Sequence, residues 1–84
     1  MVVQNYPSPF NPTTTIEFQL PERSFVKLSI YNTLGQEIET LVNEEKGVGV
    51  HRIVWNASAY PSGVYFYRLQ AGNFVETQKM ILMK

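Results

Sequence analysis

Hydrophobic and polar residues alternate with a period of two along most of this chain, in runs that turn-forming residues separate. In residues 13–20, Ile16, Phe18 and Leu20 share one face, while the residues between them are polar. Successive side chains of a β-strand point to opposite faces, so this alternation predicts a half-buried strand. By the same argument we expect further strands over residues 25–31, 37–42, 50–55, 64–70 and 74–83.

Three segments depart from simple alternation. Residues 34–42 fit a helical turn as well as a strand, and we favour the strand because so short a helix is marginal. Residues 43–49 contain three charged residues and two glycines, which is typical of an exposed hairpin or loop. Residues 64–70 are apolar on both faces, as expected for a central strand. With about six or seven strands and no convincing helix, the pattern predicts one all-β domain, an immunoglobulin-like antiparallel β-sandwich.

The composition of the chain argues against several classes of function. The 84 residues include seven basic and seven acidic side chains, interspersed along the chain, so we expect no positive face for nucleic acid. No apolar run approaches the ~20 residues of a membrane-spanning helix. The first residues, MVVQNYPS, lack the features of a secretory signal, so an exported protein would need that signal upstream. Cysteine and aspartate are absent and there is one histidine, so no metal site is expected.

The candidates for catalysis are few. His51 shares a strand face with Ile53 and Trp55, which favours a histidine at the edge of the core over a catalytic base near Ser58 or Ser62. Two pairs of glutamates, at 37 with 39 and at 44 with 45, have the residue type of a glycoside hydrolase acid pair. Their placement on strand exteriors or in an exposed loop favours solvated side chains, so we do not expect an enzyme.

Aromatic side chains suggest a binding alternative. Exposed rings could form a stacking platform for sugars, although about half of them must lie in the core of so small a sandwich. Trp55, the only tryptophan, is expected to be a core anchor. The aromatic residues considered for the platform are Tyr31, Tyr60, Phe66, Tyr67 and Phe74.

The opening of the chain is rich in proline. Pro7, Pro9 and Pro12 fix their own φ and push the preceding residues toward extended conformations. Two interpretations remain at this point: a plain proline-rich linker, or a segment along a sheet edge with Phe10 as a hydrophobic peg. We favour the second, which places linker residues at 1–4 and the domain at 5–84.

Four stretches together have a recognisable order and spacing: NYPSPFNPTTTIEFQLP, VKLSIYNTLGQEIETLV, GVHRIVWNAS and PSGVYFYRLQAGNFVETQKMILMK. They resemble the type A C-terminal sorting domain of proteins exported by the type IX secretion system of Bacteroidetes-type bacteria. The resemblance covers residues 5–84, and the immunoglobulin-like domain of flagellar hook-capping proteins is similar at greater distance. Ser8 and Asn56 depart from the usual pattern, where Asn and Asp are common, and neither departure affects the strand pattern.

The resemblance implies an immunoglobulin-like sandwich at the C-terminus of a larger secreted enzyme or adhesin. It implies as partners an upstream cargo, the outer-membrane translocon and a sortase-like protease that removes the domain and often joins the cargo to surface lipopolysaccharide. It implies a location outside the cell or on its surface, reached through the periplasm. From the residues themselves we expect no cofactor, metal or nucleic acid. The positions that match the family's motifs are Asn5, Pro7, Pro9, Phe10, Asn11, Pro12, Gly63, Val64, Tyr65, Lys79 and Lys84.

Within such a domain the last strand is the candidate for recognition. Residues 74–84 are terminal and present two different faces, and we expect Lys79 and Lys84 to point outward. A receptor that pairs with this strand would use strand addition. Two other functions stay open: a carbohydrate-binding accessory module of a secreted glycoside hydrolase, and a purely structural spacer or assembly module.

Overall fold

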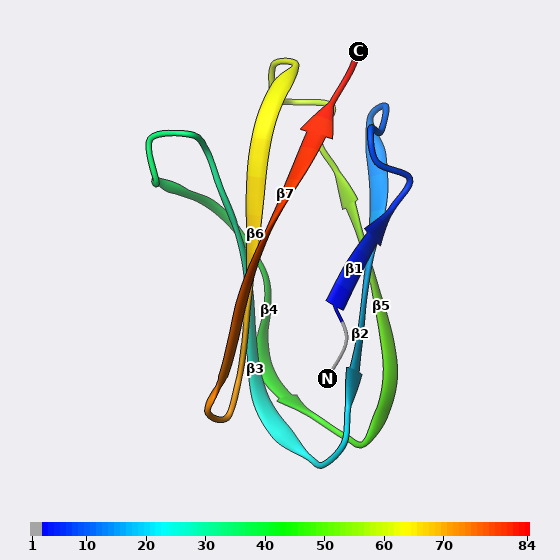
Figure 1. Cartoon of the computed structure of the whole chain (residues 1–84), viewed down its shortest axis with the longest axis vertical. Helices are drawn as coiled ribbons and strands as arrows, with labels where there is room; N and C mark the ends of the chain where they lie inside the picture. Colours follow the sequence, from blue (N-terminus) through cyan, green and yellow to red (C-terminus); the bar gives the residue numbers. More distant parts are fainter. Residues whose placement is uncertain (1–2) are drawn as a thin grey trace.

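Two antiparallel β-sheets pack face to face in the computed structural model, which describes residues 3–84 (Figure 1). One sheet has the strand order β1-β2-β5 and the other β4-β3-β6-β7, with no helix in the described residues. The expected all-β sandwich is therefore confirmed. Since the described residues form no helix, none is available there to span a membrane. The strands are β1 (Val3–Tyr6), β2 (Thr13–Leu20), β3 (Ser24–Tyr31), β4 (Glu37–Lys46), β5 (Gly49–Asn56), β6 (Gly63–Ala71) and β7 (Phe74–Leu82).

The core lies between the sheets and is built from the alternate positions that the sequence marks. Ile16, Phe18 and Leu20 of β2 are completely buried. The facing sheet supplies every second residue of its own strands, because the pleat sends neighbouring side chains to opposite faces. These facing residues include Val26, Leu28, Ile30, Tyr67, Leu69, Met80 and Leu82.

Strand β6 is central, as its two apolar faces predict. It lies between β3 and β7, and its buried residues alternate with half-buried ones such as Phe66 on the outer face. A tight turn joins β6 to β7, where Ala71 pairs with Phe74 and Gly72 has a φ of 59°. Glycine suits this turn because it takes the left-handed conformation without a steric cost.

The first strand begins earlier than the sequence analysis placed the domain. Val3 pairs with Phe18 and Gln4 with Glu17, so two residues assigned to a linker belong to the sheet. The strand has four residues and only Val3 is buried, which leaves too little alternation to recognise. The other two residues of the expected linker, Met1 and Val2, lie outside the described residues.

The expected hairpin or loop at 43–49 is wrong. Strand β4 continues to Lys46, and the chain then crosses to β5 in the other sheet, so β4 and β5 do not pair. The charged residues Glu44 and Glu45 fit this position because β4 is an edge strand, where charge discourages pairing with other chains. The alternative of a helical turn over 34–42 is also excluded, because β4 begins at Glu37.

Candidate functional site

The proline-rich segment between β1 and β2 lies against the end of the last strand. The Phe10 amide donates to the carbonyl oxygen of Ile81 at 3.0 Å, and the Met83 amide donates to the Phe10 carbonyl at 2.9 Å. Phe10 is 2% exposed, so its ring is a peg in the core. The segment therefore belongs to the fold, and the interpretation as a plain linker is wrong.

An aromatic cluster receives this peg. The Phe10 ring lies 5.7 Å from the ring of Trp55, measured between centroids. Trp55 also contacts Tyr60 and Tyr65 at 5.7 and 5.6 Å, and the Tyr65 hydroxyl donates to the carbonyl of Pro61. The prediction that Trp55 is a core anchor is confirmed. Tyr65, which the motif comparison singled out, has a packing role in the same cluster.

Glu39 closes the cluster from the opposite sheet. Its carboxylate accepts hydrogen bonds from the Trp55 indole and the Tyr60 hydroxyl, both at 3.1 Å. The expectation of a solvated Glu39 is wrong because β4 contains two irregularities, at which Ile38 and Leu41 have no partner in β3. Such bulges change the direction in which the following side chains point. Burial, and then the hydrogen bond to Glu39, raises the pKa of Tyr60.

Three more motif residues, Asn5, Pro7 and Pro12, hold the proline-rich segment in place. The Asn5 side-chain amide donates to the Thr14 hydroxyl at 3.3 Å, and that hydroxyl donates to the Pro7 carbonyl at 3.0 Å. The Pro12 carbonyl accepts from the Ala57 amide at 2.9 Å, which extends the pairing of β2 with β5. The remaining motif positions of the segment, Pro9 and Asn11, are exposed.

The glycine motif pairs with the end of the last strand. Gly63 lies opposite Leu82 and Val64 opposite Ile81, so both adjoin the residues that bind Phe10. The structure thus brings three of the predicted motif regions together: the segment around Phe10, residues 63–65 and residues 81–83. Asn5 and Lys79 lie apart from this junction.

The C-terminal residues are fixed as well. The Lys84 amide donates to the Ser62 hydroxyl at 3.1 Å, and the Lys84 ammonium donates to the Ser58 carbonyl at 2.7 Å. Lys84 and Lys79 are both exposed, as expected from the sequence. The Lys84 side chain nevertheless points back to the loop before β6, so the Ser58 carbonyl already accepts one of its ammonium hydrogen bonds.

Strand β7 is an edge strand whose outer backbone is only partly used. The bonds of Ile81 and Met83 to Phe10 show that odd-numbered residues of β7 direct their amides and carbonyls away from β6. By the alternation of an antiparallel ladder, Val75, Thr77 and Lys79 point the same way. No backbone partner of this edge segment, residues 75–79, occurs in residues 3–84.

The only histidine has a structural position. Its Nε2 lies 2.8 Å from the Gly47 carbonyl, and its ring stacks on Phe18 at 5.3 Å between centroids. This agrees with a histidine at the edge of the core. Among residues 3–84, no three acidic, histidine or cysteine side chains gather in a way that would hold a metal ion.

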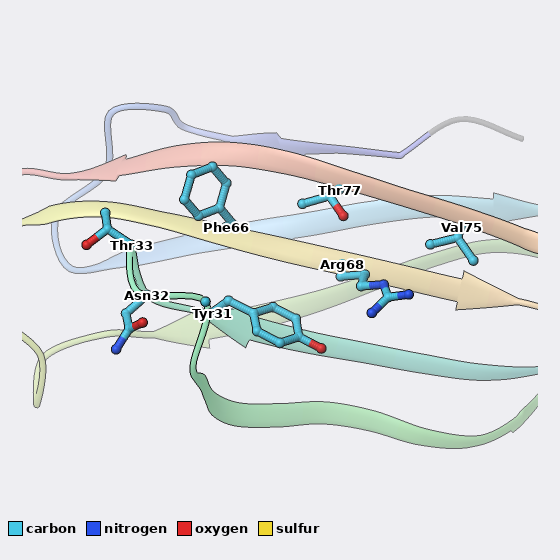
Figure 2. A pocket seen from close by; sticks show the side chains of 8 residues that line it. Tyr31, Asn32, Thr33, Phe66, Arg68, Val75 and Thr77 are labelled. Carbon is cyan, nitrogen blue, oxygen red and sulfur yellow. The ribbon is translucent and has the colours of Figure 1, made fainter.

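A groove on the outer face of the four-stranded sheet was not found from the sequence. It has a volume of about 430 Å³, and its lining comes from β3, β6, β7 and the loop after β3 (Figure 2). Tyr31 and Phe66 were considered for an aromatic platform, but Arg68 and Thr77 were not singled out. Their meeting depends on strand order, which period-two alternation alone does not give.

The comparisons with known proteins decide the family. The family model described as a secretion system C-terminal sorting domain matches residues 4–83. This chain belongs to that family. The sorting domain fills nearly the whole sequence, and the resemblance to type IX secretion sorting domains is confirmed. Searches of curated proteins and of solved structures gave no significant match.

Proposed function

We propose that this sorting domain is a non-catalytic address label, read by the type IX translocon through the open edge of β7. Membership of the family supports the sorting role. The observation that carries the mechanism is the edge segment 75–79, whose backbone donors and acceptors have no partner within residues 3–84. A strand of a receptor can add to such an edge, and the alternating side chains then contribute specificity.

The same proposal includes the fate of the cargo. An upstream protein is carried through the outer membrane with the domain, which a sortase-like protease then removes before the cargo is anchored at the surface. The site of cleavage would precede β1, because from Val3 onward the chain is held in the sheet by pairing with β2. Lys79, the exposed last residue of the edge segment, would contact the receptor.

Deletion of residues 80–84 from a full-length cargo should leave the cargo in the periplasm. That result alone does not isolate the edge, because Met80 and Leu82 are core residues and their loss also unfolds the domain. Thr77→Pro is a more specific test of the open edge of β7. Proline removes the outward amide of Thr77 and places its ring on the open edge, while the bonds between β6 and β7 use the other residues.

Val54→Pro is the matched control. The Ala57 amide bonds to Pro12, just before β2, so the even residues of β5 direct their amides to the opposite edge, where residues 3–84 supply no further strand. Export of the cargo, measured as the secreted against the periplasmic fraction, should fail for Thr77→Pro and persist for Val54→Pro. Lys79→Pro blocks the same edge and replaces Thr77→Pro in the test if the latter lowers the midpoint of thermal unfolding so far that the domain is not folded. Normal export of a folded Thr77→Pro or Lys79→Pro cargo would refute recognition through β7.

A further inference from the structure

Two of the five aromatic rings considered for a binding platform lie outside the core. Tyr60 and Phe74 pack against it and Tyr67 is buried within it, whereas Tyr31 and Phe66 belong to neither group. Both are half-buried on the outer face of the four-stranded sheet. Packing between the sheets therefore does not explain their presence.

Strand register places these rings side by side. Tyr31 of β3 lies opposite Phe66 of β6, which in turn lies opposite Lys79 of β7. In the neighbouring row, Arg68 lies opposite Thr77. Directly opposed side chains on one face of a sheet are about 4.5–5.5 Å apart at Cβ, so the two rows form one continuous surface. Figure 2 shows Tyr31, Phe66, Arg68 and Thr77 rising from three neighbouring strands around the groove.

A loop held by its own hydrogen bonds forms one end of the groove. The Asn32 side-chain oxygen accepts from the amides of Leu34 and Gln36, both at 3.0 Å, and its nitrogen donates to the Gln36 side chain. Gly35 has a φ of 79°, which lets the loop turn back. Because these hydrogen bonds lie within the loop itself, the wall that it provides exists before any ligand binds.

The charge of the groove is positive. Arg68 makes no ion pair or side-chain hydrogen bond with the described residues, and neither does Lys79. The Glu37 carboxylate beside Tyr31 is offset by Lys27 at 3.5 Å and also accepts from the Tyr31 hydroxyl. An anionic ligand is therefore favoured, with its charge placed at Arg68.

We propose that this groove binds an acidic oligosaccharide, one whose sugar rings carry uronate carboxylates. The apolar faces of sugar rings stack on exposed aromatic rings such as Tyr31 and Phe66. The planar guanidinium of Arg68 fits a carboxylate with two parallel hydrogen bonds. The exposed hydroxyls of Thr33 and Thr77 lie in the same lining and bind sugar hydroxyls.

An acidic peptide fits this surface less well. Peptides that bind sheets usually pair with an edge, where free amides and carbonyls are available. The groove instead lies on the face of β3, β6 and β7, and the backbone of β3 and β6 is paired on both sides. Side-chain stacking and the single guanidinium are what this face offers, which suits flat, hydroxylated and charged rings.

This activity is separate from sorting and can be tested on the 84-residue chain with hexagalacturonate as the probe. Titration followed by ¹H–¹⁵N spectra should move the amide signals of the groove residues, and cellohexaose, which lacks carboxylates, should move them much less. Arg68→Gln should weaken hexagalacturonate binding roughly tenfold to a hundredfold, the range for loss of a charge-assisted hydrogen bond. Phe66→Ala should weaken both sugars by removing the stacking surface.

Two controls lie elsewhere on the surface. Phe25 is an aromatic residue of β3 that is 57% exposed, so Phe25→Ala removes a ring away from the groove. Arg52→Gln removes a surface cation of the other sheet. Both should bind like the wild type. The proposal is overturned if hexagalacturonate at millimolar concentration shifts no groove signal, if the controls weaken binding equally, or if hexaglutamate binds as tightly and independently of Phe66.

Discussion

Phe10→Ala should destabilise the sorting domain by about 3–5 kcal/mol, the usual cost of removing a buried phenylalanine ring. The ring is 2% exposed and packs on Trp55 although it lies outside every regular strand. A domain of this size is stable by about 4–13 kcal/mol, from roughly 0.05–0.15 kcal/mol per residue. The substitution therefore removes a large part of the stability, and the midpoint of thermal unfolding should fall by at least about 12 °C, at ~4 °C per kcal/mol.

Urea unfolding, followed by the fluorescence of Trp55 and by far-ultraviolet circular dichroism, measures the loss. The two signals should change together, because the peg is part of one cooperative unit. Phe25→Ala is the control, since that ring is 57% exposed and its removal should cost no more than about 0.5 kcal/mol. A loss below about 1 kcal/mol for Phe10→Ala would refute the argument that the proline-rich segment is integral to the fold.

Substitutions at three further residues test polar groups of the domain. Glu39→Ala should cost about 1–3 kcal/mol in the same urea assay, because the buried Trp55 indole loses its acceptor; Glu39→Gln, which keeps an acceptor, should cost less. Burial, with the charge of Glu76 adding to it, raises the pKa of Tyr67 to about 12. Stability that is complete below pH ~10 should therefore fall as the pH approaches 12, and Tyr67→Phe should reduce this alkaline decline in the free energy of unfolding to the part that Tyr60 contributes. The hydrogen bond from Tyr6, then the contact with Arg52, lowers the pKa of Glu17. Ionised Glu17 thus stabilises the domain above its ordinary pKa and loses this effect as the pH falls through the lowered value, so acid titration of Glu17→Gln should give a flatter curve.

Much of the fold follows from the sequence because period-two alternation is strong where one face of a strand is buried. Residues 13–20 and 64–70 are the best examples, and both lie where they were expected. The placement of Trp55 and the peg role of Phe10 followed from their residue types and neighbours. These predictions rest on local sequence patterns, which are clear where alternate residues of a strand are buried in the core.

The rest depends on which strands become neighbours. Strand β1 buries only Val3, so it exists because β2 offers a partner and not because of its own pattern. Glu39 points to Trp55 because of a bulge in β4, and a one-residue irregularity reverses the face on which a side chain lies. The groove likewise requires β3, β6 and β7 to be adjacent, which no single stretch encodes.

The contact between Phe10 and β7 joins the two ends of the domain and divides the outer edge of its last strand. The backbone of Ile81 and Met83 is occupied by Phe10, while residues 75–79 stay open among the described residues. A chain that lacks residues 80–84 loses this junction and two core side chains together, so it has no ordered edge to present. Loss of export after truncation is thus expected whether the receptor reads the edge or only requires a folded domain. Proline at position 77 or 79 separates these explanations, because it removes an outward amide and leaves the junction with Phe10 intact.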